Sequence, residues 1–152
     1  MGTSWICHLA KEKMARRYLT DEKIKRKRIM VIDDEPDLTL CYRLSLEYHG
    51  FEVETFNDPR KALSNFKPDY YALVVLDIKT PDMDGFELYS EIQRIDSEAK
   101  VCFLTASESY YKEFRKKGYN ALEKDLFIRK PIENEKLVKE MDCLIARDVR
   151  NT

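Results

Sequence analysis

The chain has no long apolar segment, and it contains few glycines and few cysteines. Of its 152 residues, only four are glycine and four are cysteine. The longest apolar run is far shorter than the ~18–20 residues that a membrane helix needs, and the first residues lack the apolar core and small-residue site of a secretion signal. These absences argue against insertion into a membrane and against export, so we expect a cytoplasmic protein.

The cysteines are too scattered to form a metal site. Cys7, Cys41, Cys102 and Cys143 lie tens of residues apart with no C-x-x-C pair, and only two histidines are present to complete a zinc site. The sequence therefore predicts reduced thiols that mostly fill the core. Neither G-x-G-x-x-G nor G-x-x-x-x-G-K-[ST] occurs, so no nucleotide-binding loop is expected.

Charge is balanced over the whole chain but not along it. The formal net charge is −1, yet residues 1–28 carry nine basic and three acidic side chains, and residues 29–152 carry 18 basic and 25 acidic ones. The basic leader is either a nucleic-acid or membrane-surface arm or a solvated, partly helical extension, and the second is the commoner use of a charge run. We expect an extension over 1–27, a domain over 28–146 and a tail over 147–152, without nucleic acid as a partner.

From Ile29 onward, short apolar runs alternate with segments of helical period, which is typical of βαβ units. The expected strands are 29–32, 51–56, 72–76, 100–104 and 126–129, and a helix follows each. Apolar stripes at helical spacing, expected of helices that pack on a core, are Leu40, Leu44 and Tyr48 in the first helix and Leu88, Ile92 and Ile95 in the third. Five such units predict an α/β fold with a doubly wound, five-stranded parallel sheet.

Polar residues follow four of the five expected strands. They are Asp33, Asp34 and Glu35 after the first, Asp77 after the third, Thr105 and Ala106 after the fourth, and Lys130 after the fifth. Each alone is typical of a cap, a turn or a solvated side chain. Ligand chemistry in a doubly wound sheet, however, lies at the carboxyl ends of its strands. Carboxylates gathered there repel one another, and a site with few carboxylates suits Mg²⁺ as the counter-cation.

A carboxylate beside Mg²⁺ is a candidate nucleophile toward phosphorus, since aspartyl phosphates are known covalent intermediates. The transferring phosphoryl group then needs a cation and hydrogen-bond donors around it. Lys130 offers an ammonium, Thr105 a hydroxyl, and Ala106 a backbone N–H next to a side chain small enough to leave the site open. The strand ends therefore predict a phosphoryl-transfer site.

These residues resemble the receiver domain of two-component response regulators over about residues 28–146. The motifs that carry the resemblance are V-I-D-D-E, the apolar strand that ends at Asp77, T-P-D-M-D-G, L-T-A and K-P-I. The resemblance implies a flavodoxin-like (βα)5 domain with strand order 2-1-3-4-5. It also implies a phosphorylation-dependent switch that is not an enzyme beyond its own phosphorylation and dephosphorylation.

By this resemblance, a sensor histidine kinase or a His phosphotransfer protein donates the phosphoryl group to Asp77. Asp34 and Asp77 would bind Mg²⁺ directly, Asp33 would bind it through water, and the backbone carbonyl of Lys79 would complete the protein ligands. The long side chain of Lys79 is also expected to hinder the water that removes the phosphoryl group.

The same resemblance implies that Thr105, Lys130 and the backbone of Ala106 contact the phosphoryl group, and that Phe127 moves with Thr105 on activation. Two departures from the family pattern are Thr80, where a Met is usual, and the stretch 119–125, which lacks the usual small residues. A downstream protein target is expected. A dimer through the face formed by 107–117, 126–129 and the last helix stays open.

Two other interpretations are weighed. A haloacid-dehalogenase-like phosphatase shares the Asp nucleophile and Mg²⁺ but needs a second Asp two residues later, where Lys79 stands. A pseudo-receiver scaffold is disfavoured by the intact acids, Thr105 and Lys130. Because the sequence ends soon after the last helix, we expect either a stand-alone receiver or a fragment of a longer regulator.

Overall fold

A computed structural model describes residues 9–13, 23–25, 27–80, 82–107, 109–118 and 126–147. Most of the expected leader, the stretch 119–125 and residues 148–152 lie outside these ranges. Short helical segments occupy 9–13 and 23–25. The elements that follow are β1 (Arg28–Ile32), α2 (Pro36–Tyr48), β2 (Glu52–Phe56), α3 (Pro59–Asn65), β3 (Leu73–Asp77), α4 (Gly85–Ile95), β4 (Val101–Thr105), α5 (Ser109–Lys116), β5 (Phe127–Arg129) and α6 (Asn134–Arg147).

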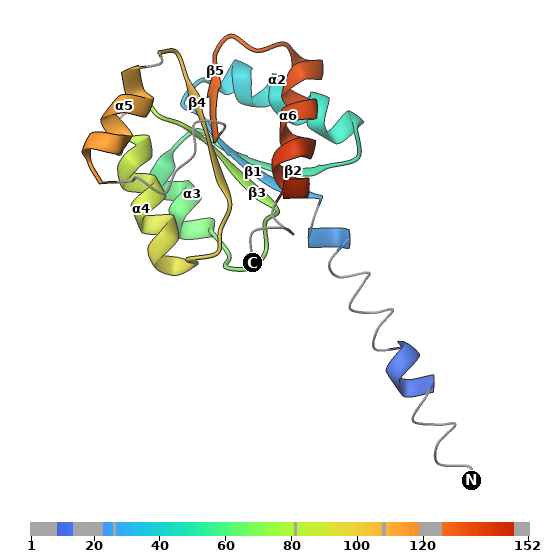
Figure 1. Ribbon diagram of the computed structural model, residues 1–152. Coiled ribbons are helices and arrows are strands. Elements are labelled where there is room, and N and C mark those ends of the chain that lie inside the picture. Colours follow the sequence, from blue (N-terminus) through green and yellow to red (C-terminus); the bar gives the residue numbers. More distant parts are fainter. Residues whose placement is uncertain are drawn as a thin grey trace.

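The five strands form one parallel sheet in the order β2-β1-β3-β4-β5 (Figure 1). This confirms the predicted fold class and strand order. The register pairs Ile32 with Leu76 and Asp77 with Leu104, so the carboxyl ends of β1, β3 and β4 meet at one edge. Asp33, which follows β1, and Asp77, which ends β3, therefore lie on neighbouring strands at this edge.

Helices cover both faces of the sheet, and each face has its own apolar core (Figure 1). Alternate strand residues face opposite sides: Met30 and Ile32 pack under α3, α4 and α5, whereas Ile29 and Val31 pack under α2 and α6. Every residue of β3 and β4 is buried. Burial on both faces explains why these strands are apolar up to their last residues, Asp77 and Thr105.

The predicted apolar stripe of α2 faces outward, so its assignment to the core was wrong. Leu40, Leu44 and Tyr48 are 51%, 56% and 87% exposed, and we refer to these three residues as the α2 stripe. The buried face of α2 is formed by Thr39, Tyr42 and Leu46. Thr39 can lie inside because its hydroxyl donates to the Pro36 carbonyl (3.0 Å) and accepts from the Asn57 amide (3.0 Å). Because its hydroxyl has hydrogen-bond partners, Thr39 can lie among apolar residues on the face of α2 that packs on the sheet.

Two other side-chain placements differ from expectation. Ile95, in the last turn of α4, is 45% exposed, although the rest of its predicted stripe is buried. Among the described cysteines only Cys102 is buried, whereas Cys41 and Cys143 are exposed free thiols, so the prediction of mostly core-filling cysteines was wrong. Burial raises the pKa of the Cys102 thiol well above its usual range.

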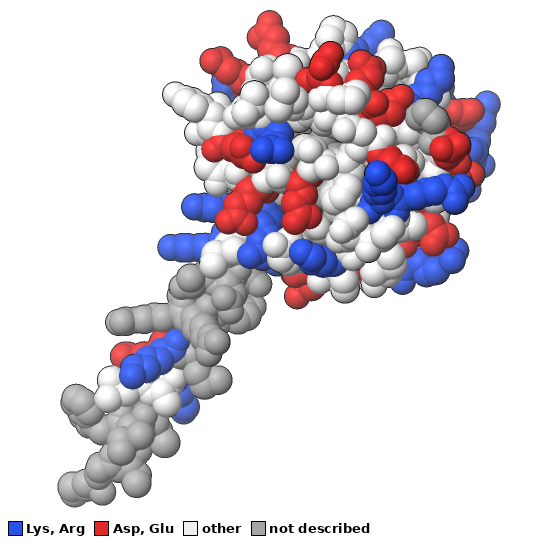
Figure 2. Space-filling model, turned by 180° about the vertical axis from the view of Figure 1, so that it is seen from behind, with Lys and Arg blue, Asp and Glu red and all other residues white. Residues whose placement is uncertain are grey.

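The surface carries mixed charge. Figure 2 shows acidic and basic side chains interspersed over one face of the domain. No helix within the described ranges combines the length and the apolar character needed to cross a bilayer.

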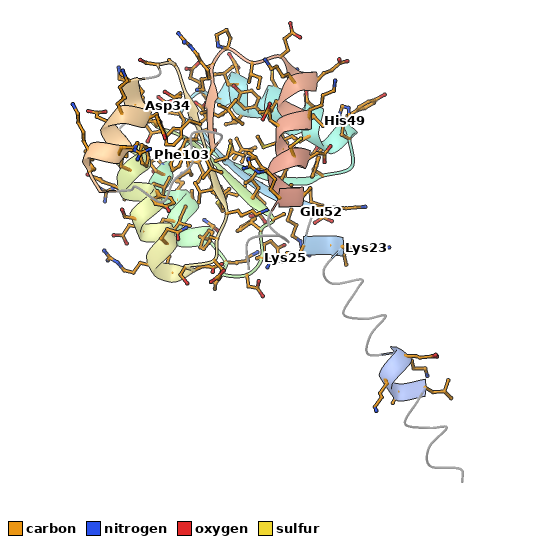
Figure 3. The ribbon with its side chains drawn as sticks, in the orientation of Figure 1. Lys23, Lys25, Asp34, His49, Glu52 and Phe103 are labelled. Atoms are coloured by element: carbon orange, nitrogen blue, oxygen red, sulfur yellow. The ribbon has the colours of Figure 1, made fainter. Side chains whose placement is uncertain are left out.

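The segment before β1 is attached to the amino end of the sheet. Lys25 pairs with Asp69 in the loop before β3. The guanidinium of Arg28 lies 4.0 Å from the ring centre of Tyr70 and 3.3 Å from a carboxylate oxygen of Glu52. Figure 3 shows Lys25 and Glu52 at this end of the domain and Asp34 at the other.

Candidate functional site

Four neighbouring strands bring the predicted site residues to the carboxyl edge of the sheet. They are Asp33 and Asp34 directly after β1, Asp77 at the end of β3, Thr105 and Ala106 at the end of β4, and Lys130 after β5. Asp33, Asp77 and Thr105 are 0%, 7% and 4% exposed, so each is a polar residue buried among mostly apolar ones. Buried polar groups of this kind require partners.

The ammonium of Lys130 lies between two of the carboxylates. Its Nζ is 2.6 Å from Asp33 Oδ2 and 3.5 Å from Asp77 Oδ2. Burial alone would lower the pKa of Lys130, but the hydrogen bond and charge of Asp33, together with Asp77, raise it above the ordinary value. The site therefore holds a fixed positive charge against the end of β3.

Asp33 is held by several hydrogen bonds. Its Oδ1 accepts from the backbone N–H of Glu35 (3.1 Å), and its backbone N–H donates to the Phe56 carbonyl (3.1 Å). The Asn57 amide donates to the Asp33 carbonyl (2.8 Å). Sequence analysis did not single out Asn57, although it follows β2 at the same sheet edge, and the strand-end rule that selected Asp33 could have found it.

Three consecutive acidic residues after β1 bring their carboxylate oxygens close together. Asp33, Asp34 and Glu35 each place a carboxylate oxygen within 4.8 Å of the others. Sequence analysis gave Glu35 no ligand role. Asp77 is outside this three-carboxylate group, and its link to Asp33 runs through Lys130. A set made only of oxygen donors suits a hard cation such as Mg²⁺.

Asp77 is a buried carboxylate with a perturbed proton affinity. Burial, and then the charge of Asp33, raise its pKa from 3.8 to about 6, and Lys130 opposes the shift. Its Oδ1 also accepts from the backbone N–H of Lys79 (3.3 Å), while the Lys79 side chain is exposed. A desolvated carboxylate beside a second one is unfavourable as an anion, and a bound cation would relieve it.

The loop after Asp77 is closed by a glycine. The backbone N–H of Gly85 donates to the Ile78 carbonyl (2.9 Å). A Cβ at position 85 would lie 2.8 Å from Ile78 Cα and 3.1 Å from the Asp77 carbonyl oxygen. Asp84 then caps α4 by accepting from the Glu87 N–H (2.9 Å). The close approach fixes the path of the chain directly behind the Asp77 carboxylate.

The Thr105 hydroxyl is engaged with the turn that follows β4. Oγ1 donates to the Ser107 carbonyl (2.9 Å) and accepts from the Ser107 N–H (3.1 Å). The Ser107 hydroxyl in turn lies 2.9 Å from that of Ser109 and accepts from its N–H (3.2 Å), at the start of α5. These contacts connect the end of β4 to α5, and Ala106 lies exposed between Thr105 and Ser107.

Phe127 packs within an aromatic cluster. Its ring stacks on Phe103 with centroids 4.9 Å apart and an interplanar angle of 17°. Tyr111 and Phe114 contact it edge-on, at centroid distances of 5.2 Å and 5.0 Å. Phe103 lies on the sheet face that α3, α4 and α5 cover, near α5 in Figure 3. Phe127 thus touches both β4 and α5, the elements that the Thr105 contacts also join.

Comparisons with known proteins agree on one family. A family model for the response regulator receiver domain matches residues 29–142. The transcriptional regulatory protein TrcR of Mycobacterium tuberculosis is 33% identical over 120 residues, which are 79% of this chain and 46% of that protein. RprY of Bacteroides fragilis, also a transcriptional regulatory protein, is 30% identical over 127 residues, or 84% and 51% of the two chains. The chain spans about half the length of the curated relatives it matches.

Solved structures give the same result. The response regulator TrrA of Thermotoga maritima, in complex with Mg²⁺ and BeF, is 29% identical with a TM-score of 0.65, covering 78% of this chain and 98% of that one. The non-phosphorylated HemR receiver domain of Leptospira biflexa is 28% identical with a TM-score of 0.68, covering 78% and 94%.

Proposed function

This chain belongs to the response regulator receiver domain family, and we propose that it is a signalling switch in which Asp77 accepts a phosphoryl group from a sensor histidine kinase or a His phosphotransfer protein. The observation that carries the proposal is the Lys130 ammonium, held 2.6 Å from Asp33 and 3.5 Å from Asp77. A fixed cation beside a buried carboxylate is what a transferring phosphoryl group requires.

The residues present fit Mg²⁺. Asp33 and Asp34 each place a carboxylate oxygen within 4.8 Å of the other, and Asp77 ends the neighbouring strand, where burial and the charge of Asp33 raise its pKa. When bound, the ion would neutralise these carboxylates and draw negative charge from the phosphoryl oxygens. We assign the three aspartates, with the Lys79 backbone carbonyl, as the groups that hold it.

The chain's own groups carry the transfer. A carboxylate oxygen of Asp77 forms the new bond to phosphorus while the bond from phosphorus to the donor imidazole nitrogen breaks, and the electron pair of that bond stays with the imidazole. Lys130 donates to a phosphoryl oxygen, as does the backbone N–H of Ala106. To donate to a phosphoryl oxygen, the Thr105 hydroxyl must give up the hydrogen bond that it donates to the Ser107 carbonyl. The phosphorylated state therefore differs from the unphosphorylated one at the start of α5.

The α2 stripe is a candidate contact surface for the protein that donates the phosphoryl group. Leu40 and Leu44 are more than half exposed, and Tyr48 is 87% exposed, on a helix that begins directly after Asp34 and Glu35. An apolar strip on an exposed helix is typical of a protein contact surface. A donor protein bound there would bring its histidine to the carboxyl edge of the sheet, where Asp77 lies.

The test is phosphorylation by acetyl phosphate with and without Mg²⁺, followed by intact-mass measurement. We expect wild type to gain one phosphoryl group only with Mg²⁺, Asp77→Asn to gain none, and Asp142→Asn, on the exposed side of α6, to behave as wild type. Absence of an adduct in wild type would indicate a pseudo-receiver. Continuous release of phosphate from small phosphate monoesters would instead indicate the phosphatase.

A further inference from the structure

The side chain of Asn57 joins the two ends of the loop that carries the acidic residues. Asn57 directly follows β2, and its Nδ2 donates both to the Asp33 carbonyl (2.8 Å) and to the Thr39 hydroxyl (3.0 Å). Since an amide nitrogen carries two hydrogens, one side chain can make both bonds. Asp33 begins the loop and Thr39 lies in the first turn of α2. We refer to these two hydrogen bonds as the Asn57 clamp.

Shorter-range hydrogen bonds hold the loop between these ends. The backbone N–H of Glu35 donates to Asp33 Oδ1 (3.1 Å), and the backbone N–H of Thr39 donates to the Glu35 carbonyl (3.1 Å). The Thr39 hydroxyl donates to the Pro36 carbonyl (3.0 Å). Each of these bonds begins or ends at Asp33 or Thr39. Asn57 adds a link from outside the loop, and this link fixes the distance between the two ends.

The loop needs such a restraint because its own charges repel one another. Asp33, Asp34 and Glu35 each keep a carboxylate oxygen within 4.8 Å of the others. Like charges at this separation favour a more open loop. A cation that met an open loop would have to close it on binding, and the cost of closing would weaken its affinity. A loop that is already held closed avoids this cost.

We propose that Asn57 is a positioning residue for the Mg²⁺ site, because the clamp keeps the carboxylates of Asp33 and Asp34 close together before the ion binds. This inference rests on the proposed function, which assigns those carboxylates to Mg²⁺. The affinity for Mg²⁺ is sensitive to positioning, since this ion demands a near-octahedral set of ligands at short distances. Loss of an outer partner of a metal ligand commonly weakens metal binding by about 10–100-fold.

Asn57 can be replaced without disturbing the core. It is exposed, so Asn57→Ala removes the clamp and leaves no buried cavity. The matched control is Asn65→Ala at the last residue of α3. Asn65 is also exposed, and its Nδ2 donates to the Lys61 carbonyl (2.8 Å) within the same helix. Both substitutions therefore remove an exposed amide that donates to a backbone carbonyl.

The experiment measures Mg²⁺ binding directly on the full, unphosphorylated chain. MgCl₂ is titrated into ¹⁵N-labelled protein at constant ionic strength, and the Kd is obtained from the shifts of amide resonances. Because the clamp acts on the main chain of Asp33 and not on its carboxylate, we expect Asn57→Ala to raise the Kd by about three- to tenfold. Asn65→Ala should raise it by less than about 1.5-fold.

Urea unfolding in EDTA measures the stability of the same variants separately. A rise in the Kd of less than about threefold for Asn57→Ala overturns the proposal, even if the variant is less stable than wild type. Asn57 would then support the fold without positioning the metal ligands. An equal rise in the Kd for Asn65→Ala overturns it as well, because that residue has no bond to the acidic loop.

Substitutions of Thr39 test whether the clamp acts as a unit. Thr39→Val removes the hydroxyl that accepts from Asn57, whereas Thr39→Ser keeps a hydroxyl there. We expect the Val variant to raise the Kd for Mg²⁺ and the Ser variant to stay near wild type. Asn57→Ala/Thr39→Val should raise the Kd by less than the product of the two single effects, because both changes remove the same bond. Equal Kd values for the two Thr39 variants, or a full product in the double variant, contradict the clamp.

Phosphorylation by acetyl phosphate separates this inference from the proposed function. In Asn57→Ala, the Mg²⁺ concentration that gives half the maximal rate should rise in step with the Kd. The rate at saturating Mg²⁺ should stay within about twofold of wild type, because Asp77 and Lys130 make no hydrogen bond to Asn57.

The outcomes for the two proposals are distinct. An unchanged half-saturating Mg²⁺ concentration in Asn57→Ala refutes the role of Asn57 and leaves the phosphorylation chemistry standing. If wild type binds Mg²⁺ and Asn57→Ala weakens the binding, but no adduct forms, the proposed function alone is contradicted. If wild type binds no Mg²⁺, both proposals fail.

Discussion

Replacing Asp77 by Asn should stabilise the metal-free protein. The substitution keeps the shape of the side chain and an oxygen that can accept from the Lys79 N–H, but it removes a buried negative charge close to Asp33. The Asp77 pKa rises from 3.8 to about 6 on folding. That shift corresponds to about 3 kcal/mol of unfavourable free energy when the group is fully ionised.

The sign of the pH dependence follows from the direction of the shift. The folded state binds the Asp77 proton more tightly than the unfolded chain does, so wild type loses stability as pH rises from about 4 through about 6. Because Asn carries no such charge, the variant should exceed wild type by about 3 kcal/mol near pH 7.5 and by only about 1 kcal/mol near pH 4.5.

Urea unfolding followed by circular dichroism, in EDTA, measures both free energies. Asp142→Asn, on exposed α6, should match wild type at both pH values. Adding Mg²⁺ should narrow the gap, because an ion that binds only the folded wild type stabilises it. The reasoning fails if Asp77→Asn is no more stable than wild type near neutral pH, or if its advantage is the same at both pH values.

Three further predictions concern the loop after Asp77 and the packing of α2. Gly85→Ala should lower the free energy of unfolding by about 1–3 kcal/mol, because its Cβ would lie 2.8 Å from Ile78 Cα, and unchanged urea unfolding would contradict this. Leu46→Ala should lower the free energy of unfolding by about 2–5 kcal/mol, because Leu46 is only 1% exposed. Leu44→Ala should lower it by less than about 0.5 kcal/mol, because Leu44 is 56% exposed. Equal losses for the two variants would mean that Leu44 packs in the core, as the sequence predicted. Lys79→Ala should shorten the lifetime of the phosphoryl adduct, followed by intact mass after acetyl phosphate is removed, and an unchanged lifetime would refute its role in hindering water.

The fold was predictable because its central strands are unambiguous. All five residues of β3, and all five of β4, are buried, and the first four of each strand form an unbroken apolar run in the sequence. The α2 helix shows the limit of the same approach. It has apolar residues on two sides, and its buried face includes Thr39, whose hydroxyl donates to the Pro36 carbonyl and accepts from Asn57 at the end of β2. That contact is invisible to a periodicity argument.

The edge of the site was predictable, but its internal contacts were not. The rule that ligands bind at the carboxyl ends of parallel strands placed Asp77, Thr105 and Lys130 at one edge of the sheet, from their positions after successive strands alone. Which partner each side chain takes depends on distances of a few ångströms between separate strands. The Lys130 ammonium between two carboxylates, and the tie between Thr105 and Ser107, therefore emerged only from the three-dimensional structure.

The attachment of the segment before β1 has a practical consequence for measurement. Lys25 and Arg28 are fixed to Asp69 and Glu52 at the amino end of the sheet, and the five residues of β1 separate that end from Asp33 by roughly 16 Å at ~3.3 Å per residue. A biotin or surface tether placed ahead of Lys25 would leave the carboxyl edge of the sheet, with Asp33 and Asp77, facing solution. The chain can thus be immobilised for kinetic assays of phosphorylation without blocking this edge.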